Sequence, residues 1–190
     1  MKNKFLFSLC TTAILTALAF GLEAYGKIPL PFLELSLAFV PILFCGMLQG
    51  PIWAMLCAFL TDFIATTVAG SGTYFIGFAP AVLLTGCLFG LIGLVNNKCK
   101  STTLFCVFTA VITLINALLS EGVLKSAGIL AYQVFISNSA EQFSVKLLMG
   151  IFAARFIFVL VQGAVVFALA LLGRKQILPK IQKATRSFYV

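Results

Sequence analysis

Two charged residues, Asp62 and Arg155, lie inside long apolar stretches of the 190-residue sequence. A charge near the centre of a bilayer costs about 2.5–3.5 kcal/mol, so such a residue normally faces a protein interior or a cavity. Thr66 follows Asp62 by one helical turn, and we interpret the two as a structural polar pair inside the membrane. Gln162 lies on the same helical face as Arg155. Arg155 either forms an ion pair with Asp62 or binds an anionic ligand through a bidentate contact.

A polar stripe runs along another apolar stretch. It consists of Thr109, Thr113, Asn116 and Ser120, which fall on one face of a helix with about 3.6 residues per turn. Such side chains can hydrogen-bond across helices, each for roughly 0.6–2 kcal/mol. This interhelical role is favoured for Thr109 and Thr113. Asn116, predicted to lie level with Arg155, is equally consistent with ligand binding.

Two connecting segments carry features of a ligand site. The glycine-rich segment 70–78 presents three aromatic side chains, Tyr74, Phe75 and Phe78. They form either an aromatic belt at the membrane interface or a cover over a flat ligand. The segment 28–34 contains two prolines, which make it stiff and extended, and it ends at Glu34.

Several chemistries are excluded by what the sequence lacks. It has no histidine, which removes the Ser-His-Asp triad and most zinc sites. It has no GxxxxGK[ST] loop for ATP. None of the six cysteines forms a CxxC pair, so they are expected to be free thiols. We therefore expect no enzymatic activity, no metal site and no cofactor in this chain.

The composition indicates an all-α integral membrane protein. Of the residues, 62% are apolar and 9% are charged, against about 45–50% and 25% in soluble proteins. Apolar stretches predict six transmembrane helices in one domain, residues 1–190, at about 5–22, 35–49, 52–69, 75–95, 103–119 and 147–172. Residues 121–145 form the longest predicted connection.

The basic residues predict the orientation of this bundle. With six spans, one side collects nine cations and no acid: Lys2, Lys4, Lys98, Lys100, Arg174, Lys175, Lys180, Lys183 and Arg186. Cytoplasmic segments are enriched in such residues, so both termini are expected in the cytoplasm, with 174–190 as a short basic tail. The net charge of +8 is then a topology signal and a contact for lipid headgroups, and nucleic-acid binding is not expected.

Small residues recur at four-residue spacing. The pairs Gly46 and Gly50, and Gly86 and Gly90, suggest close helix packing. Ala13 and Ala17 form a similar shallow strip on the first predicted helix. This strip packs either against another helix of the same chain or against another membrane protein.

The chain resembles the substrate-binding (S) components of energy-coupling factor (ECF) vitamin transporters, most closely the folate-type branch. The resemblance lies in residues 35–53, Asp62, 71–78, 84–90 and the sequence Ala153-Ala154-Arg155-Phe156. It implies a six-helix protein of the bacterial plasma membrane that binds a vitamin from outside and topples to deliver it. It also implies a membrane scaffold subunit and two cytoplasmic ATPases as partners, with Ala13 and Ala17 as the docking surface.

The candidate substrate-binding residues are Glu34, Tyr74, Phe75, Phe78, Asn116, Arg155 and Gln162. Folate-type members commonly carry a basic residue where this chain has Glu34, which could instead hydrogen-bond a pterin ring. Other vitamins or precursors, such as pantothenate, riboflavin or a queuosine precursor, are alternative ligands. A non-transporting cell-shape or assembly scaffold is the alternative function.

Overall fold

The computed structural model describes residues 2–26, 28–30, 33–68, 76–99, 101–129 and 162–177. The first half holds α1 (Lys2–Tyr25), a hairpin of β1 (Ile28–Leu30) and β2 (Leu33–Leu35), α2 (Phe39–Gln49) and α3 (Pro51–Val68). The second half holds the 3₁₀ turn η1 (Ile76–Phe78), α4 (Ala79–Lys98), α5 (Thr102–Ile115), the π-helical segment η2 (Asn116–Leu124) and the π turn η4 (Gly173–Ile177). Residues 125–129 and 162–172 are also α-helical.

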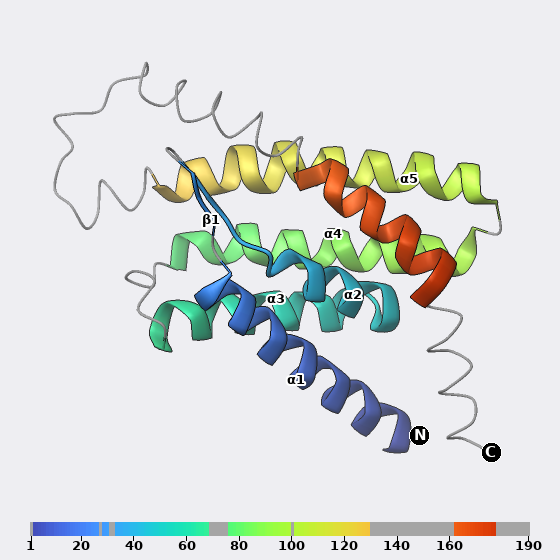
Figure 1. Cartoon of the computed structure of the whole chain (residues 1–190), viewed down its shortest axis with the longest axis horizontal. Helices are drawn as coiled ribbons and strands as arrows, with labels where there is room; N and C mark the ends of the chain where they lie inside the picture. The colour runs from blue at the N-terminus through green and yellow to red at the C-terminus, as the bar shows by residue number, and fades with distance from the viewer. Residues whose placement is uncertain are drawn as a thin grey trace, which may run out of the picture.

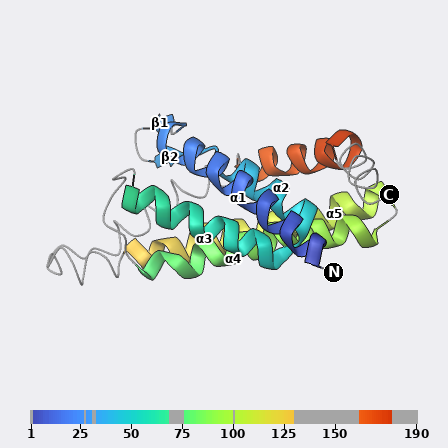
Figure 2. The ribbon, with the colours of Figure 1, turned by 90° about the horizontal axis from the view of Figure 1, so that it is seen from below.

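The helices form one elongated bundle. In Figure 1, α4 lies between α5 and the pair α2 and α3, while α1 packs on the other side of that pair. Figures 1 and 2 place the hairpin at one end of the bundle and the start of α1 and the α4–α5 turn at the other. The described part is therefore helical except for one short hairpin, as expected for an all-α protein.

The lengths and apolar surfaces of the helices fit a multi-pass membrane protein. Four helices in the described ranges are long and apolar enough to cross a bilayer: Phe5–Tyr25, Pro51–Val68, Ile76–Lys98 and Thr102–Ile129. The helix predicted at 35–49 is the shorter Phe39–Gln49. Of the helix predicted at 147–172, the structure describes residues 162–172.

Two predicted helix boundaries are wrong. The helix predicted to begin at 35 begins at Phe39, because Leu35 belongs to a strand and pairs with Ile28 in the antiparallel hairpin. The helix predicted to end at 119 continues to Ile129 through the π-helical segment. Residues 103–129 contain no proline, so no residue breaks the helix at the predicted end. The connection predicted at 121–145 therefore cannot begin before residue 130.

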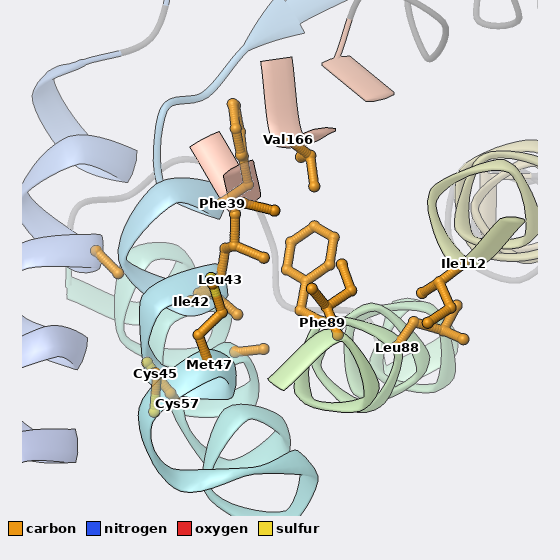
Figure 3. Packing of buried hydrophobic residues seen from close by; sticks show 14 of the residues in the cluster. Phe39, Ile42, Leu43, Cys45, Met47, Cys57, Leu88, Phe89, Ile112 and Val166 are labelled. Carbon is orange, nitrogen blue, oxygen red and sulfur yellow. The ribbon is translucent and has the colours of Figure 1, made fainter. Parts of the chain in front are cut away.

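A hydrophobic core joins α2 to α4. Leu43 and Met47 of α2 lie close to Phe89 of α4, and Ile112 of α5 and Val166 add to the same cluster (Figure 3). All six cysteines are free thiols, and Cys45 and Cys57 belong to this core. In the described part of the chain, the 16 buried residues of this core set the spacing of the helices that surround the polar groups described below.

Glycines let α4 approach α2 and α3 closely. A Cβ atom on Gly90 would lie 2.1 Å from the Cα of Pro51, and one on Gly93 would lie 2.1 Å from the backbone oxygen of Gly46. A Cβ on Gly86 would lie 2.7 Å from the oxygen of Ala54. The close packing predicted for Gly46, Gly86 and Gly90 is confirmed.

Gly50 has a different role from the one its spacing suggested. Nothing lies within 4 Å of its would-be Cβ, and its φ is +93°. Glycine adopts this backbone region without the steric cost that other residues meet. Gly50 thus ends α2 and lets the chain enter α3 at Pro51.

The predicted polar stripe is buried on one face of the helix. Thr109, Thr113, Asn116 and Ser120 are all buried. Ser120 Oγ donates to the carbonyl oxygen of Ala81 at 2.7 Å and lies 2.6 Å from Thr85 Oγ1, both on α4. Thr113 bonds only carbonyls of its own helix, and Thr109 Oγ1 has no hydrogen-bond partner in the described part of the chain. The interhelical hydrogen bonds predicted for these two threonines are therefore wrong within the described residues. Ser120 makes the bonds to a neighbouring helix instead.

This difference makes a matched pair of variants informative. Ser120→Ala should lower the free energy of unfolding by about 1 kcal/mol, because it removes the bonds to α4. Thr109→Val should leave stability unchanged or raise it, because it removes a buried hydroxyl that makes no bond. Thermal unfolding of the purified protein in detergent measures both. Equal losses in the two variants would contradict this assignment of the interhelical bond.

Candidate functional site

A cavity of about 260 Å³ opens near the hairpin end of the bundle. Ligand sites in proteins begin at about 300 Å³, so this cavity is close to that range. The helices α1 to α4, the turn η1 and the helical segments 125–129 and 162–172 contribute to its wall, which consists of Glu23, Ser36, Ala38, Phe39, Ile42, Ala58, Thr61, Asp62, Phe78, Val82, Thr85, Lys125 and Gln162. Because these residues come from so many elements, the cavity exists only when the bundle is assembled.

Glu23 and Ser36 form a hydrogen-bonded joint in this wall. Ser36 Oγ donates to Glu23 Oε2 and accepts a bond from the backbone N–H of Ala38 at 3.1 Å. The bonds tie the end of α1 to the start of α2. They also hold one carboxylate oxygen of Glu23 in a fixed position on the cavity wall.

Asp62 lies on the wall from α3 and is half-buried. Thr66 Oγ1 donates to the backbone oxygen of Asp62 at 2.9 Å, so the threonine hydroxyl is hydrogen-bonded within its own helix. Thr61 likewise donates to the backbone oxygen of Cys57, at 2.8 Å. The two threonines thus satisfy their hydroxyls locally, and the Asp62 carboxylate is the group on this helix that gives the wall its charge.

Both signs of charge meet at the cavity. Lys125 lines the cavity together with Glu23 and Asp62, so the described lining residues include two carboxylates and one ammonium group. Phe78 adds an aromatic surface and Gln162 an amide. This combination can bind a flat molecule with hydrogen-bond donors at one position and a negative group at another.

The predicted site residues are only partly brought together. Phe78 and Gln162 line the cavity, and so does Asp62, which was predicted as an intramembrane polar residue. Asn116 is buried and is not among the described lining residues, and its Oδ1 has no hydrogen-bond partner among the described residues. The backbone of Glu34 pairs with Pro29 in the hairpin. Its side chain, like Tyr74, Phe75 and Arg155, lies outside the described residues.

Sequence reasoning missed five polar residues of this wall: Glu23, Ser36, Thr61, Thr85 and Lys125. Glu23 and Lys125 could have been suspected, because the predicted topology places both at the same side of the membrane. Ser36, placed just before an apolar helix, carried the signal of a helix start. The threonines gave no comparable signal.

A second hollow of about 460 Å³ lies between α1 and α3. Ala13 and Ala17 line it and are exposed. The remaining lining is nearly all apolar: Leu9, Thr12, Thr16, Phe20, Trp53, Leu56, Leu60 and Ile64. We call this surface the α1–α3 groove. The small-residue strip is thus an open surface of the bundle and is not covered by a neighbouring helix of the described chain.

Solved structures with similar folds are transport proteins. FolT bound with folic acid has a TM-score of 0.67 and 20% sequence identity, covering 86% of this chain and 92% of that chain. The S component of a bacterial ECF transporter has a TM-score of 0.61 and 20% identity, covering 95% and 99%. At this level of identity the likeness concerns the fold.

Two curated relatives are folate transporters named FolT. The protein of Leuconostoc mesenteroides subsp. mesenteroides is 30% identical over 66 residues, which are 35% of this chain and 36% of the relative. The protein of Streptococcus mutans serotype c is 32% identical over 87 residues, which are 44% of this chain and 45% of the relative. The chain thus matches less than half the length of either relative.

A family model described as "ECF transporter, substrate-specific component" matches residues 7–172. That range contains the whole cavity wall and the whole α1–α3 groove. Proteins of this family are transport subunits without enzymatic activity, which agrees with the missing ATP-binding loop. The chain, a multi-pass membrane protein, therefore belongs to the substrate-specific components of ECF transporters.

Proposed function

We propose that this chain binds folate from outside the cell and delivers it inward. The observation that carries this proposal is the cavity with two carboxylates, one ammonium and an aromatic ring on its wall. A pterin ring presents neighbouring N–H donors that a carboxylate accepts, and the glutamyl tail is an anion that a cation binds. The fold likeness to FolT bound with folic acid and the matches to two folate transporters support the same ligand.

The proposed contacts combine structure and sequence. Asp62 or Glu23 accepts bonds from the ring, while Phe78 stacks on it. From the sequence we propose Tyr74 and Phe75 as a further cover, Glu34 as an acceptor at the mouth and Arg155 as a partner of the glutamyl carboxylates. Gln162, already on the wall, supplies an amide.

We further propose that the cavity end faces outward and both termini are cytoplasmic. The described cations Lys98 and Arg174 support this orientation, because Lys98 ends α4 and Arg174 bonds the next residue, whereas α4 begins beside Phe78 of the cavity wall. Arg174 donates to the backbone oxygen of Cys99 at 2.8 Å and stands over the Phe105 ring. Cations on cytoplasmic segments follow the positive-inside pattern.

Energy for transport must come from partners, because this chain has no ATP-binding loop. We propose a membrane scaffold subunit and two cytoplasmic ATPases, together called the energising module, which dock on the α1–α3 groove. The family match removes the alternative of a non-transporting scaffold. A different vitamin or precursor is the remaining alternative, and a ligand panel decides between them.

Calorimetric binding to the purified protein tests the proposal. Folate should bind at least tenfold more tightly than riboflavin, pantothenate or a queuosine precursor. Arg155→Ala should weaken folate binding by about 1.5–3 kcal/mol, the usual range for a hydrogen bond to a charged group. Lys98→Ala, at the far end of the bundle, should have no effect. Preference for another panel member would overturn folate, and unchanged affinity in Arg155→Ala would overturn that contact alone.

A further inference from the structure

We infer that the π-helical segment η2 (Asn116–Leu124) turns Lys125 onto the cavity wall, where its ammonium group pairs with a carboxylate of the bound ligand. The inference rests on the proposed function for the ligand's identity. It assigns a specificity-determining cation that the polar pattern of the sequence does not indicate. It also explains why this helix departs from α geometry at this position.

An uninterrupted α-helix would place Lys125 on the wrong face. Lys125 follows Asn116 by nine residues, which is about 2.5 turns of an α-helix and hence the opposite side. The buried stripe that begins at Thr109 would continue instead at Val123 and Ala127. An α-helical Lys125 would therefore face away from the bundle.

The structure shows the reverse pattern. Val123 is 53% exposed and Ala127 is also exposed, whereas Ser126 and Gly128 are buried and Lys125 lines the cavity. The cause is η2, because a π-helix bonds residue i to i+5 and so holds more residues in each turn. Each residue of a π-helix therefore rotates the chain by a smaller angle than a residue of an α-helix does. Over the nine residues of η2 the difference adds up to about half a turn, which rotates the following helix relative to an uninterrupted α-helix.

Contacts with α4 and η1 hold this register at two points. Within η2, Ser120 is bonded to Ala81 and lies against Thr85, which is itself a lining residue. Beyond η2, a Cβ on Gly128 would lie 2.8 Å from the ring of Phe78. The helix is thus fixed on both sides of Lys125 by residues of the cavity wall or their direct neighbours.

Lys125 brings a positive charge to a wall that otherwise carries two carboxylates among its described residues. Glu23 and Asp62 come from α1 and α3, while Lys125 enters from the other half of the chain. π-helical segments occur often at functional sites, and here the segment places the only cation among the described lining residues.

The first test compares folate with an uncharged pteroyl amide, which keeps the ring system and lacks the glutamyl carboxylates. Lys125→Ala should weaken folate binding by about 10- to 100-fold and leave binding of the amide within about threefold. Lys125→Arg should restore most of the loss, and Lys98→Ala should change neither ligand. Equal weakening of both ligands would show a purely structural role and overturn the inference.

The second test reads the helical register directly. Single cysteines replace Val123, Lys125 or Ala127, and a membrane-impermeant thiol reagent is quantified at each peptide by mass spectrometry, so that native cysteines do not interfere. Lys125→Cys should react, and folate at a concentration that saturates this weakened variant should protect it at least fivefold, while the other two positions should gain no protection. Protection at Ala127→Cys in place of Lys125→Cys would overturn the π-helical register.

Failure of the proposed function is distinguishable from failure of this inference. If the wild-type protein binds no folate, the folate proposal is wrong, and the reactivity of positions 125 and 127 without ligand still decides the register. If folate binds tightly and Lys125→Ala leaves its affinity unchanged, the folate proposal survives and the role of Lys125 is wrong.

Discussion

Ala13→Trp or Ala17→Trp is expected to abolish assembly with the energising module while leaving vitamin affinity unchanged. Both alanines are exposed in the α1–α3 groove, whose volume of about 460 Å³ is bounded by apolar side chains. In a membrane, helices associate through small residues that let their backbones approach closely. An indole ring at either position would fill the groove and hold a partner helix away. The cavity wall contains neither alanine, so ligand binding should be spared.

Co-purification of the module with tagged chain measures assembly, and calorimetry measures binding. Ile14→Trp and Leu18→Trp are matched controls, because these residues are 65% and 54% exposed on the same helix and do not line the groove. Both controls should assemble normally. Assembly that survives both alanine changes would show that the groove is not the docking surface.

Gly90→Ala is expected to lower the free energy of unfolding by about 2–3 kcal/mol, in the upper part of the range for overpacking. The added methyl carbon would lie 2.1 Å from the Cα of Pro51 and 2.8 Å from its Cβ. These are backbone and ring atoms at the start of α3, so no flexible side chain can move aside. Either α3 and α4 separate, or the turn at Gly50 distorts.

Thermal unfolding in detergent checks this expectation against two control glycines. Nothing lies within 4 Å of a Cβ built on Gly21 or Gly163. Alanine has a higher helix propensity than glycine by about 1 kcal/mol, so Gly21→Ala and Gly163→Ala should be neutral or stabilising. A Gly90→Ala protein as stable as these controls would show that α3 and α4 are not in close contact there.

The predicted helices agree well with the structure because bilayer physics leaves few choices. A backbone in hydrocarbon must satisfy its polar groups internally, so each long apolar run becomes a helix. This holds for α1, α3 and α4, and the glycine spacing correctly indicated where α4 packs closely. The errors fell at residues 35–38, which precede the helix, and after residue 119, where a π-helical segment continues the helix.

The candidate site was less predictable, for a physical reason. Intramembrane Asp62 and aromatic Phe78 stand out in the sequence, and both line the cavity. Lys125 does not stand out, because its helical face depends on a change of register that leaves no simple periodic pattern. From the sequence, Glu23 is only a charged residue outside the predicted spans. Its bond to Ser36 forms because the end of α1 meets the start of α2 in the folded protein.

By itself, the sequence determined the membrane class, most of the helices, the excess of basic over acidic residues and the lack of an ATP-binding loop. These properties follow from composition and local periodicity, which act within one segment at a time. Only the tertiary structure decided which polar side chains share a cavity and that Ala13 and Ala17 stay exposed in the α1–α3 groove. Those outcomes depend on how each helix is rotated and how closely it packs, and side chains far apart in the chain set both.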